Sequence, residues 1–296
     1  FEARRVGGAM VAANLARHLN EQFADMPEKW KPLVYCWRGG MRSGSMVQWM
    51  RLVGWDAQQL AGGYKSFRRH VITQIEELVP QLQLRVILGA TGSAKTSVLQ
   101  ALEKLDAQVL DLEHFARHKG SLLGNLPGID QPSQKSFETQ IATVLENIDV
   151  SRPVYVEGES ARIGRIALPL PLVAQMRDAR AIEIAATPEA RLEYLLRDYA
   201  YLGDDSEALA GKLAILTESR GKETVGRWQA WAHEGNLAPL FSELMSSHYD
   251  PHYERSQSNH FRDWANRQRI EASALAPADI DRVAQQILDL EQQKPS

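Results

Sequence analysis

A short apolar run at residues 84–88 leads directly into a loop with two glycines at residues 89–96, and a helical pattern follows to about residue 105. A buried strand of this length needs cover on its faces, and the helix that follows it provides part of that cover. Strands that alternate with helices indicate a parallel sheet joined by crossover helices, so we predict an α/β fold. Further short strands are expected at residues 33–36, 57–60, 109–110, 154–156 and 181–185.

The loop at residues 89–96 follows the pattern G-x-x-x-x-G-K-[ST], except that Ala94 replaces the last glycine. In such a loop backbone amides surround phosphate oxygens, Lys95 neutralises them, and Thr96 is placed to contact Mg²⁺. The methyl group of Ala94 is expected to crowd a phosphate and weaken its binding. A glycine-rich turn with a solvated lysine is the alternative. The predicted phosphate-binding residues are Gly89, Thr91, Gly92, Ser93, Ala94, Lys95 and Thr96.

Acidic side chains follow two of the predicted strands. Asp111 and Glu113 come after one strand, and Glu157 and Glu159 come after the next. In phosphate-binding folds a carboxylate at such a position orients a metal ion or acts as a base. An ordinary exposed acid at a strand end is an equally good interpretation of each residue. The histidines show no metal-ligand spacing, and no metal site is predicted.

A second strand–loop–helix segment lies upstream and carries the chain's one cysteine, Cys36. Glycines in its loop let backbone N–H groups converge on the sulfur, and a helix N-terminus adds positive potential. Arg38 and Arg42 add two positive charges, and each effect favours the thiolate, which is the nucleophile. The same surroundings suit an anionic persulfide or perselenide, whereas a small cysteine buried in a core is the alternative. The predicted anion-binding loop beside the catalytic Cys36 is Trp37, Arg38, Gly39, Gly40, Met41, Arg42 and Ser43.

Basic side chains flank both loops. Residues 1–85 hold 12 Lys and Arg against 7 Asp and Glu, a net charge of +5, although the whole chain has −3. Phosphate contacts from such groups give affinity without reading base sequence, while a solvated charged surface is the ordinary interpretation of any one cluster. The predicted contacts to a phosphodiester backbone are Lys65, Arg68 and Arg69; Arg117, His118 and Lys119; and Arg162 and Arg165.

Pro80 interrupts the helical pattern before it and marks the predicted boundary between a first domain, 1–80, and a second, 81–296.

No apolar run approaches the roughly 20 residues that cross a bilayer, so no membrane span is expected. A single cysteine excludes an internal disulfide framework. Because no leader pattern opens the chain, we expect a cytoplasmic protein.

Residues 36–43 resemble the active loop of rhodanese-type chalcogen transferases, and the match extends through Gly54 and the Gly-Gly-Tyr-Lys at residues 62–65. Such modules usually have an earlier strand and helix with an Asp-x-Arg sequence, which this chain lacks before Phe1. The resemblance therefore implies the C-terminal part of a rhodanese-like parallel-sheet domain, with an incomplete sheet. A P-loop NTPase-like α/β domain with a mostly helical C-terminal region is expected to follow it.

A rhodanese loop followed by a phosphate loop is an uncommon order. Further sequence blocks lie at residues 111–113, 116–121, 157–160, 163–164, 168–169 and 249–253. The two loops in this order and these blocks make the chain similar to the tRNA 2-selenouridine synthases, a family in which a rhodanese module is fused to a P-loop module. The departures are Ala94 and the missing front of the first domain.

This resemblance implies a two-stage modification of the wobble uridine in the tRNAs for Lys, Glu and Gln. Geranyl diphosphate alkylates the 2-thio group, and selenium from selenophosphate then replaces the geranylthio group, with Cys36 carrying selenium as a perselenide. Lys95 and Thr96 would hold the diphosphate or phosphates of the tRNA. Mg²⁺ is a candidate ion, no tightly bound cofactor is expected, and an enzyme that supplies selenophosphate is a candidate partner.

Two other functions stay open at this point. One is a rhodanese-type sulfurtransferase fused to a small-molecule kinase, which would turn over ATP without tRNA. The other is an RNA-binding regulator with inactive sites. The oligomeric state is also open.

Overall fold

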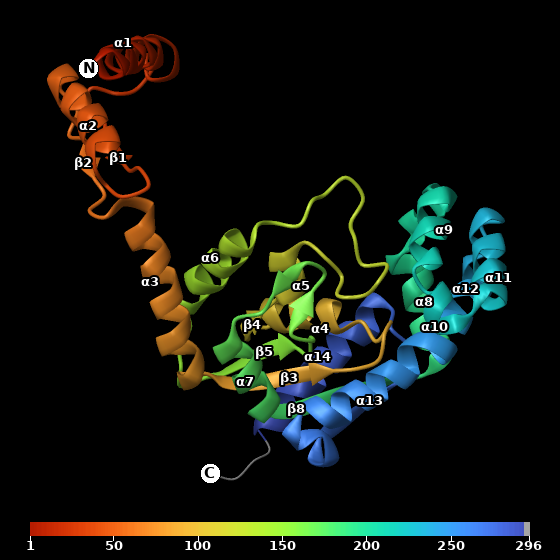
Figure 1. Cartoon of the computed structure of the whole chain (residues 1–296). Helices are drawn as coiled ribbons and strands as arrows, with labels where there is room; N and C mark the ends of the chain where they lie inside the picture. Colours follow the sequence, from red (N-terminus) through yellow and green to blue (C-terminus); the bar gives the residue numbers. More distant parts are fainter. Residues whose placement is uncertain (293–296) are drawn as a thin grey trace. The chain divides into compact units, whose positions relative to one another are not determined.

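The computed structural model describes residues 1–292, which fall into two units (Figure 1). The first unit is Phe1–Thr73 and the second begins at Gln74. The division lies within one helix, α3 (Gly63–Leu78), before the Pro80 at which the sequence places a domain boundary. Each unit has a hydrophobic core of its own.

In the first unit two short strands pair in parallel. β1 (Leu33–Val34) pairs with β2 (Gln58–Gln59), so the paired segments are shorter than the strands that the sequence predicts. Trp30 and Trp55 pack edge to face at 5.1 Å between ring centroids, and they close a small core around Val47. The helices of this unit are α1 (Glu2–Arg17), α2 (Met41–Val53) and the first part of α3.

The second unit is built on a five-stranded parallel sheet in the order β4-β5-β3-β8-β9. Parallel strands have their carboxyl ends at one edge, so the loops after β3, β5 and β4 meet there. Because β3 is central, the loop at residues 89–96 lies in the middle of that edge. The strands are β3 (Gln83–Leu88), β4 (Gln108–Leu110), β5 (Pro153–Glu157), β8 (Arg180–Ala186) and β9 (Gln268–Ala272).

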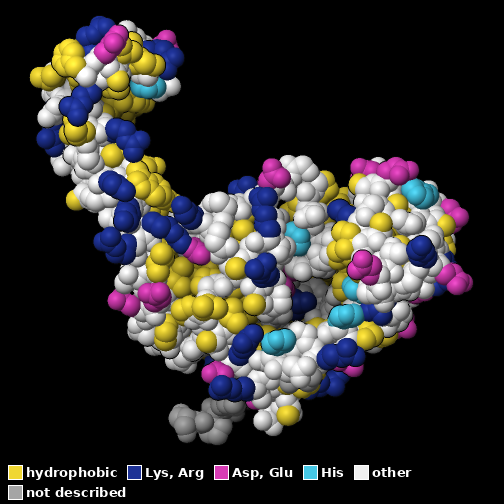
Figure 2. All heavy atoms as spheres, viewed as in Figure 1, with side chains coloured by type: hydrophobic (Ala, Val, Ile, Leu, Met, Phe, Trp, Pro, Cys, Tyr) yellow, Lys and Arg dark blue, Asp and Glu magenta, His cyan; other side chains and the backbone are white. Residues whose placement is uncertain are grey.

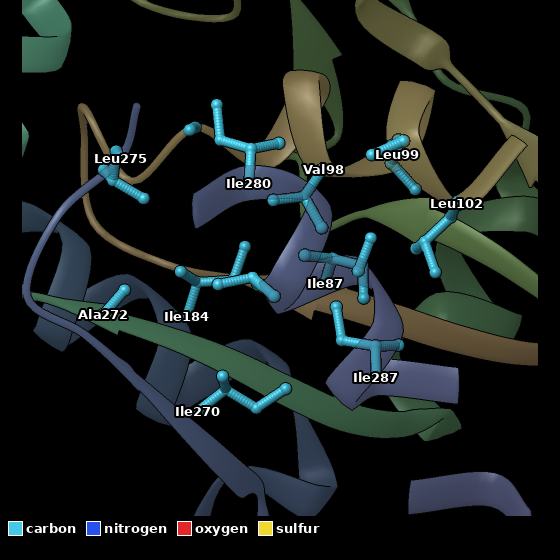
Figure 3. Close-up of a cluster of buried hydrophobic side chains, with 14 of the residues drawn as sticks. Ile87, Val98, Leu99, Leu102, Ile184, Ile270, Ala272, Leu275, Ile280 and Ile287 are labelled. Atoms are coloured by element: carbon cyan, nitrogen blue, oxygen red, sulfur yellow. The ribbon is translucent and has the colours of Figure 1, made fainter. Parts of the chain in front are cut away.

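One face of this sheet is covered by α4 (Lys95–Lys104) and α14 (Pro277–Gln292), which pack against each other. Figure 3 shows Ile87 and Ile184 of the strands beside Val98 of α4 and Ile287 of α14. These four side chains are buried, so the strand that carries the loop at residues 89–96 and the helix that follows it are fixed by one core.

On β3 successive side chains alternate between the two faces. Leu84, Val86 and Leu88 therefore face away from α4, and α7 (Leu170–Asp178) packs against this strand. The remaining elements around the sheet are α5 (Leu112–Ala116), α6 (Gln134–Leu145), and the antiparallel pair β6 (Arg162–Ile163) and β7 (Ile166–Ala167).

The chain after β8 is mostly helical, as the sequence predicts. Thr187 caps the N-terminus of the first helix by accepting a hydrogen bond from the backbone N–H of Ala190. A second core forms around the fully buried Trp228. The helices are α8 (Pro188–Asp198), α9 (Ser206–Ala214), α10 (Thr217–Arg220), α11 (Lys222–His233), α12 (Leu237–Leu244) and α13 (Asp250–His260).

β9 is the exception to this helical region. It pairs in parallel with β8 at the edge of the sheet, and of its five residues only Ile270 and Ala272 are buried. Two small or branched apolar residues between charged neighbours give a weak strand pattern, which is why the sequence did not predict it. The predicted α/β class with parallel sheets and a helical C-terminal region is confirmed. None of the helices within residues 1–292 has the length and apolar character that crossing a membrane requires.

Candidate functional site

The loop at residues 89–96 connects β3 to α4 with tight backbone geometry. Ala94 lies in the left-handed region at φ 58°, immediately before the helix. Gly92 has φ 87°, and a Cβ atom there would lie 2.9 Å from Leu195. Lys95 donates a hydrogen bond from Nζ to the carbonyl of Gly89 at 3.0 Å. The loop thus curls around its own lysine, in the form expected of a phosphate-binding turn.

A cavity of about 500 Å³ opens over this loop. Its walls come from the phosphate loop, from the chain segments after α5 and β5, and from α8 and α13. Polar side chains predominate near the loop, so the cavity suits a charged ligand. Among its lining residues are Lys95, Thr96, Glu113, Gly120, Glu159, Tyr194, Tyr199, His252, Tyr253 and Gln257.

Carboxylates stand directly behind the phosphate loop. Thr96 donates a hydrogen bond from Oγ1 to Glu113 at 2.8 Å, and the backbone N–H of Glu113 donates to Glu157 at 2.7 Å. Glu157 is fully buried, and its Oε2 has no hydrogen-bond partner in the described chain. Burial, followed by the charges of Asp111 and Glu113, raises the pKa of Glu157 well above its usual range.

Glu113 and Glu159 form a pair at the cavity wall. Both lie against Gly120, where a Cβ atom would come within 2.5 Å of a Glu113 oxygen and 2.9 Å of a Glu159 oxygen. Burial and the nearby charge of Glu113 raise the pKa of Glu159 to about 8, and burial also raises the pKa of Glu113. Two close carboxyls in a poorly solvated site hold a proton between them at neutral pH. Asp111 instead caps α5 by accepting a hydrogen bond from the N–H of His114.

An ion pair between a buried arginine and a half-buried aspartate braces the other side of the phosphate loop. Arg191 of α8 makes a bidentate contact with Asp250 at the start of α13, with N–O distances of 2.6 and 3.0 Å. Its Nε also donates to the carbonyl of Thr91 at 2.8 Å. One guanidinium therefore fixes the loop backbone and the segment that carries Tyr253 into the cavity.

In the first unit, close backbone packing holds the Cys36 loop, together with hydrogen bonds from the Gln59 side chain. A Cβ atom at Gly63, which has φ 61°, would lie 2.1 Å from the carbonyl oxygen of Cys36. A Cβ atom at Gly39 would lie 2.7 Å from the backbone N of Gly63. The start of α3 and the cysteine loop thus touch at positions where only glycine fits.

The sulfur of Cys36 accepts a hydrogen bond from Ser43 Oγ at 3.1 Å. This hydroxyl has the largest effect on the thiol, followed by the backbone N–H of Ser43, and N–H groups of Arg38 and Gly40 add smaller ones. Together they lower the pKa of Cys36 from its usual 9.0 to about 6. The amides converge on the sulfur as the sequence predicts, and the Ser43 hydroxyl lowers the pKa of Cys36 more than they do. An effect of the Arg38 and Arg42 guanidinium charges on this pKa stays a prediction.

Comparison with known proteins identifies a family, and the part matched by its family model lies within the second unit. Residues 82–214 match the family model described as the tRNA 2-selenouridine synthase AAA domain. The chain is 40% identical over 168 residues to the tRNA 2-selenouridine synthase of Alcanivorax borkumensis, covering 56% of this chain and 45% of that protein. To the Nitrosomonas europaea protein of the same name it is 34% identical over 201 residues, covering 67% and 52%.

A third protein of that name, from Shewanella denitrificans, is 33% identical over 250 residues, which cover 75% of this chain and 66% of that protein. The chain belongs to the tRNA 2-selenouridine synthase family. It spans about half the length of the first curated relatives it matches. A solved shikimate kinase from Acinetobacter baumannii with bound shikimate aligns at a TM-score of 0.30 and 18% identity over 75% of this chain and 99% of that one, too weak a likeness to carry an argument.

The RNA contacts that the sequence predicts fall into two groups in this structure. Lys65, Arg69, Arg117, Arg162 and Arg165 are exposed. The last two line a second cavity of about 910 Å³, which shares Gly120 and Ser121 with the cavity over the phosphate loop. The Arg165 guanidinium donates a hydrogen bond to the carbonyl of Gln131. An RNA contact by these five exposed residues stays a prediction.

The other group is engaged within the protein. His118 is buried, and burial lowers its pKa, so it is neutral at pH 7. Lys119 pairs with Asp198 at 2.8 Å and lies over the ring of Tyr199 at 4.4 Å. Arg68 is half-buried. For these three residues an RNA contact stays a prediction.

Sequence reasoning missed Gln59 of β2. Its Nε2 donates to Ser43 Oγ at 2.9 Å and to the carbonyl of Gly39 at 2.6 Å, so it orients the hydroxyl that contacts Cys36. In the second unit it also missed Arg191 and Gln257. Nothing local in the sequence marks these three residues. The block at residues 249–253 is the sequence feature that points to α13 as part of the cavity wall.

Proposed function

We propose that this chain acts in the conversion of wobble 2-thiouridine to 2-selenouridine in tRNA, through an S-geranyl intermediate. Family membership and two loops suited to two different anions support the proposal. The observation that carries it is the accessible Cys36 thiol with a pKa of about 6. Such a thiol is mostly thiolate at neutral pH, and the thiolate is the nucleophile that exchange at carbon 2 of the base requires.

In the first stage the phosphate loop holds geranyl diphosphate. Lys95 turns from the carbonyl of Gly89 to a phosphate oxygen, and the loop amides bind the others. The 2-thio sulfur attacks carbon 1 of the geranyl group, and its electron pair forms the C–S bond. The C–O bond to diphosphate breaks, and that pair leaves with the diphosphate.

Alkylation of the sulfur also removes the proton from N3 of the base. We assign this proton to the Glu113–Glu159 pair, which lines the same cavity as Lys95. With the pKa of Glu159 near 8, the pair gives a proton to the leaving diphosphate and regains one from N3 at neutral pH. Glu157 contributes by fixing the backbone of Glu113.

In the second stage the Cys36 thiolate attacks carbon 2 and expels geranylthiolate, which leaves Cys36 bonded to the base. Selenium in selenophosphate is already at the selenide level; it attacks carbon 2 and returns the Cys36 thiolate. Water then cleaves the P–Se bond and releases phosphate, so electrons balance without an oxidant or reductant. A perselenide on Cys36, as the resemblance implied, needs an oxidant to form and a thiol to release selenium.

The oxygens of Thr96 and Glu113 fit a Mg²⁺ ion, which prefers oxygen ligands and keeps several waters. When bound, the ion would neutralise charge on the diphosphate. Within residues 1–292 no group of three or more His, Cys, Asp or Glu side chains is arranged to hold a metal ion. An ion at this loop would therefore depend on the substrate's phosphates for most of its ligands.

The proposal is tested by nucleoside mass spectrometry of tRNA from cells that carry the full-length protein or its variants. With Cys36→Ala, 2-selenouridine is expected to disappear while geranylated 2-thiouridine persists. With Lys95→Ala, both nucleosides are expected to disappear. Normal selenation by Cys36→Ala would contradict the role of Cys36, and unchanged nucleosides together with ATP turnover on a small acceptor would favour the kinase alternative.

A further inference from the structure

Aromatic side chains are stacked beside the Cys36 loop. The rings of Trp37 and Tyr64 lie 5.5 Å apart between centroids at an interplanar angle of 29°, and Phe67 follows at 6.2 Å from Tyr64. Trp37 is 48% exposed and Phe67 38% exposed, although a soluble protein usually buries most of a large aromatic surface. The stack therefore offers a flat apolar surface to solvent.

The backbone ties this stack to the cysteine. The N–H of Tyr64 donates to the carbonyl of Cys36 at 2.9 Å, and the N–H of Lys65 donates to the carbonyl of Trp37 at 3.1 Å. Because Gly63 leaves no space between the two segments, the backbone that carries the rings keeps a fixed position against the backbone of Cys36. A planar group stacked on Trp37 would lie beside Cys36.

The surroundings of the stack are strongly basic. Between residues 33 and 70 the sequence holds six Lys and Arg against one acid, Asp56. Arg38, Arg42, Lys65 and Arg69 are exposed, and Figure 2 shows Lys and Arg side chains gathered along α3. A flat apolar surface among cations fits a ligand that alternates planar rings with anionic groups, which is single-stranded nucleic acid.

We propose that Trp37 and Tyr64 form a platform on which one unpaired RNA base stacks, with the cations of the Cys36 loop and α3 contacting its flanking phosphates. The inference rests on the proposed function and names how the base reaches Cys36. Stacking on the platform places the base next to the sulfur, so that carbon 2 comes within reach of it. A base within a duplex is stacked on its neighbours, so the platform selects a base in a loop.

The test measures the affinity of the full-length protein for an anticodon stem–loop RNA, and for the same RNA with the wobble base removed to leave an abasic site. Trp37→Ala is expected to weaken binding of the intact RNA about tenfold, because base–aromatic stacking is worth about 1–3 kcal/mol. Trp37→Phe is expected to restore much of that loss. Trp49 is the matched control because it is 49% exposed in the same unit but lies outside the stack; Trp49→Ala is expected to leave affinity unchanged.

The abasic RNA separates stacking from other effects. Wild type is expected to bind it about tenfold more weakly than the intact RNA, and Trp37→Ala is expected to cause no further loss. Equal losses on both RNAs, or no loss with Trp37→Ala, would overturn the platform. Capture of a protein partner that needs Trp37, without dependence on the base, would also overturn it.

Failure of this inference can be told apart from failure of the proposed function. If wild type forms selenouridine and Trp37→Ala binds the intact RNA normally, the platform alone is refuted. Base-dependent loss of binding in Trp37→Ala, with no selenouridine formed by wild type, refutes the function alone. The alkylation rate of Cys36 serves as the fold control. If the Trp37→Ala variant folds correctly, Cys36 keeps its hydrogen bond from Ser43 and the rate is unchanged.

Discussion

The loops at residues 36–43 and 89–96 are built alike but affect ionisable groups in opposite directions. Each connects the end of a parallel strand to the start of a helix. Beside the first, hydrogen bonds lower the pKa of an accessible thiol to about 6. Beside the second, burial raises the pKa of Glu113, Glu157 and Glu159. The comparison teaches that hydrogen bonds to the charged form keep the thiol ionised in one loop, whereas burial disfavours the charged form of the carboxyls beside the other.

The two loops also differ in what holds them in place. The Cys36 loop rests on backbone contacts at Gly39 and Gly63. The phosphate loop is braced by the Arg191–Asp250 ion pair and by the core under α4. A thiolate that attacks a base needs access, while a diphosphate gains more from an enclosed site.

The largest expected effect breaks the second loop. Lys95→Ala should weaken binding of inorganic diphosphate by about 100-fold. The bound diphosphate loses a charge-assisted hydrogen bond from the half-buried ammonium of Lys95. Lys104→Ala, at the exposed end of the same helix, is the control and should change nothing. Isothermal titration calorimetry measures both. Equal affinities in the two variants would contradict the assignment of the loop.

The second prediction concerns the raised pKa of Glu159. Between pH 4.5 and about 8 the folded protein keeps a proton that the unfolded chain releases, so raising the pH through this window lowers the free energy of unfolding. Glu159→Gln removes the titrating carboxyl and should flatten the pH dependence of the free energy of unfolding. Because Glu159 is half-buried, we expect this free energy to rise by about 1 kcal/mol at pH 8. Thermal unfolding of both proteins from pH 5 to pH 8 checks it. Parallel stability curves would show that Glu159 ionises normally.

The third prediction addresses the first loop. Ser43→Ala removes the group with the largest effect on the Cys36 thiol and should raise its pKa toward the usual value. At pH 7 the thiolate fraction then falls, and alkylation by iodoacetamide should slow by about tenfold. Ser45→Ala is the matched control, since the Ser45 hydroxyl donates to the carbonyl of Arg42 and not to sulfur. Similar slowing in both variants would mean that the hydroxyl of Ser43 is not the cause.

The smallest effect is expected at Ala94, where the sequence predicts crowding of a phosphate. Ala94 is buried and belongs to the core under α4. Glycine would relieve about 1 kcal/mol of left-handed backbone strain but lose about 0.8 kcal/mol of methyl burial. Ala94→Gly should therefore leave stability nearly unchanged and diphosphate affinity within about twofold. A large gain in diphosphate affinity would instead support the crowding that the sequence predicts.

The sequence predicts well what local pattern determines. Strand, loop and helix around Lys95 form a contiguous motif, and their order alone places the lysine at the carboxyl edge of a parallel sheet. The same holds for Cys36 and Ser43, whose spacing follows from one loop entering one helix. β9 escaped prediction because two buried residues in an edge strand carry little periodicity.

What the sequence does not give are contacts between distant segments. Gln59 reaches Ser43, Glu113 meets Glu159 beside Gly120, and Arg191 reaches Asp250 only because the folded chain brings their elements together. Gln59 and Arg191 have an unremarkable neighbourhood in the sequence, and for the other residues the sequence marks the residue but not its partner. Charge alone also misleads, since buried His118 cannot act as an exposed cation.

The most direct test of the account is the rate of Cys36 alkylation in wild type as a function of pH. The protein has one cysteine, so the signal belongs to Cys36. The account predicts a midpoint near pH 6, with nearly full reactivity at pH 7. A midpoint near the usual value of 9.0 would contradict it, because the sulfur would then be protonated at the pH at which the proposed function uses it as a nucleophile.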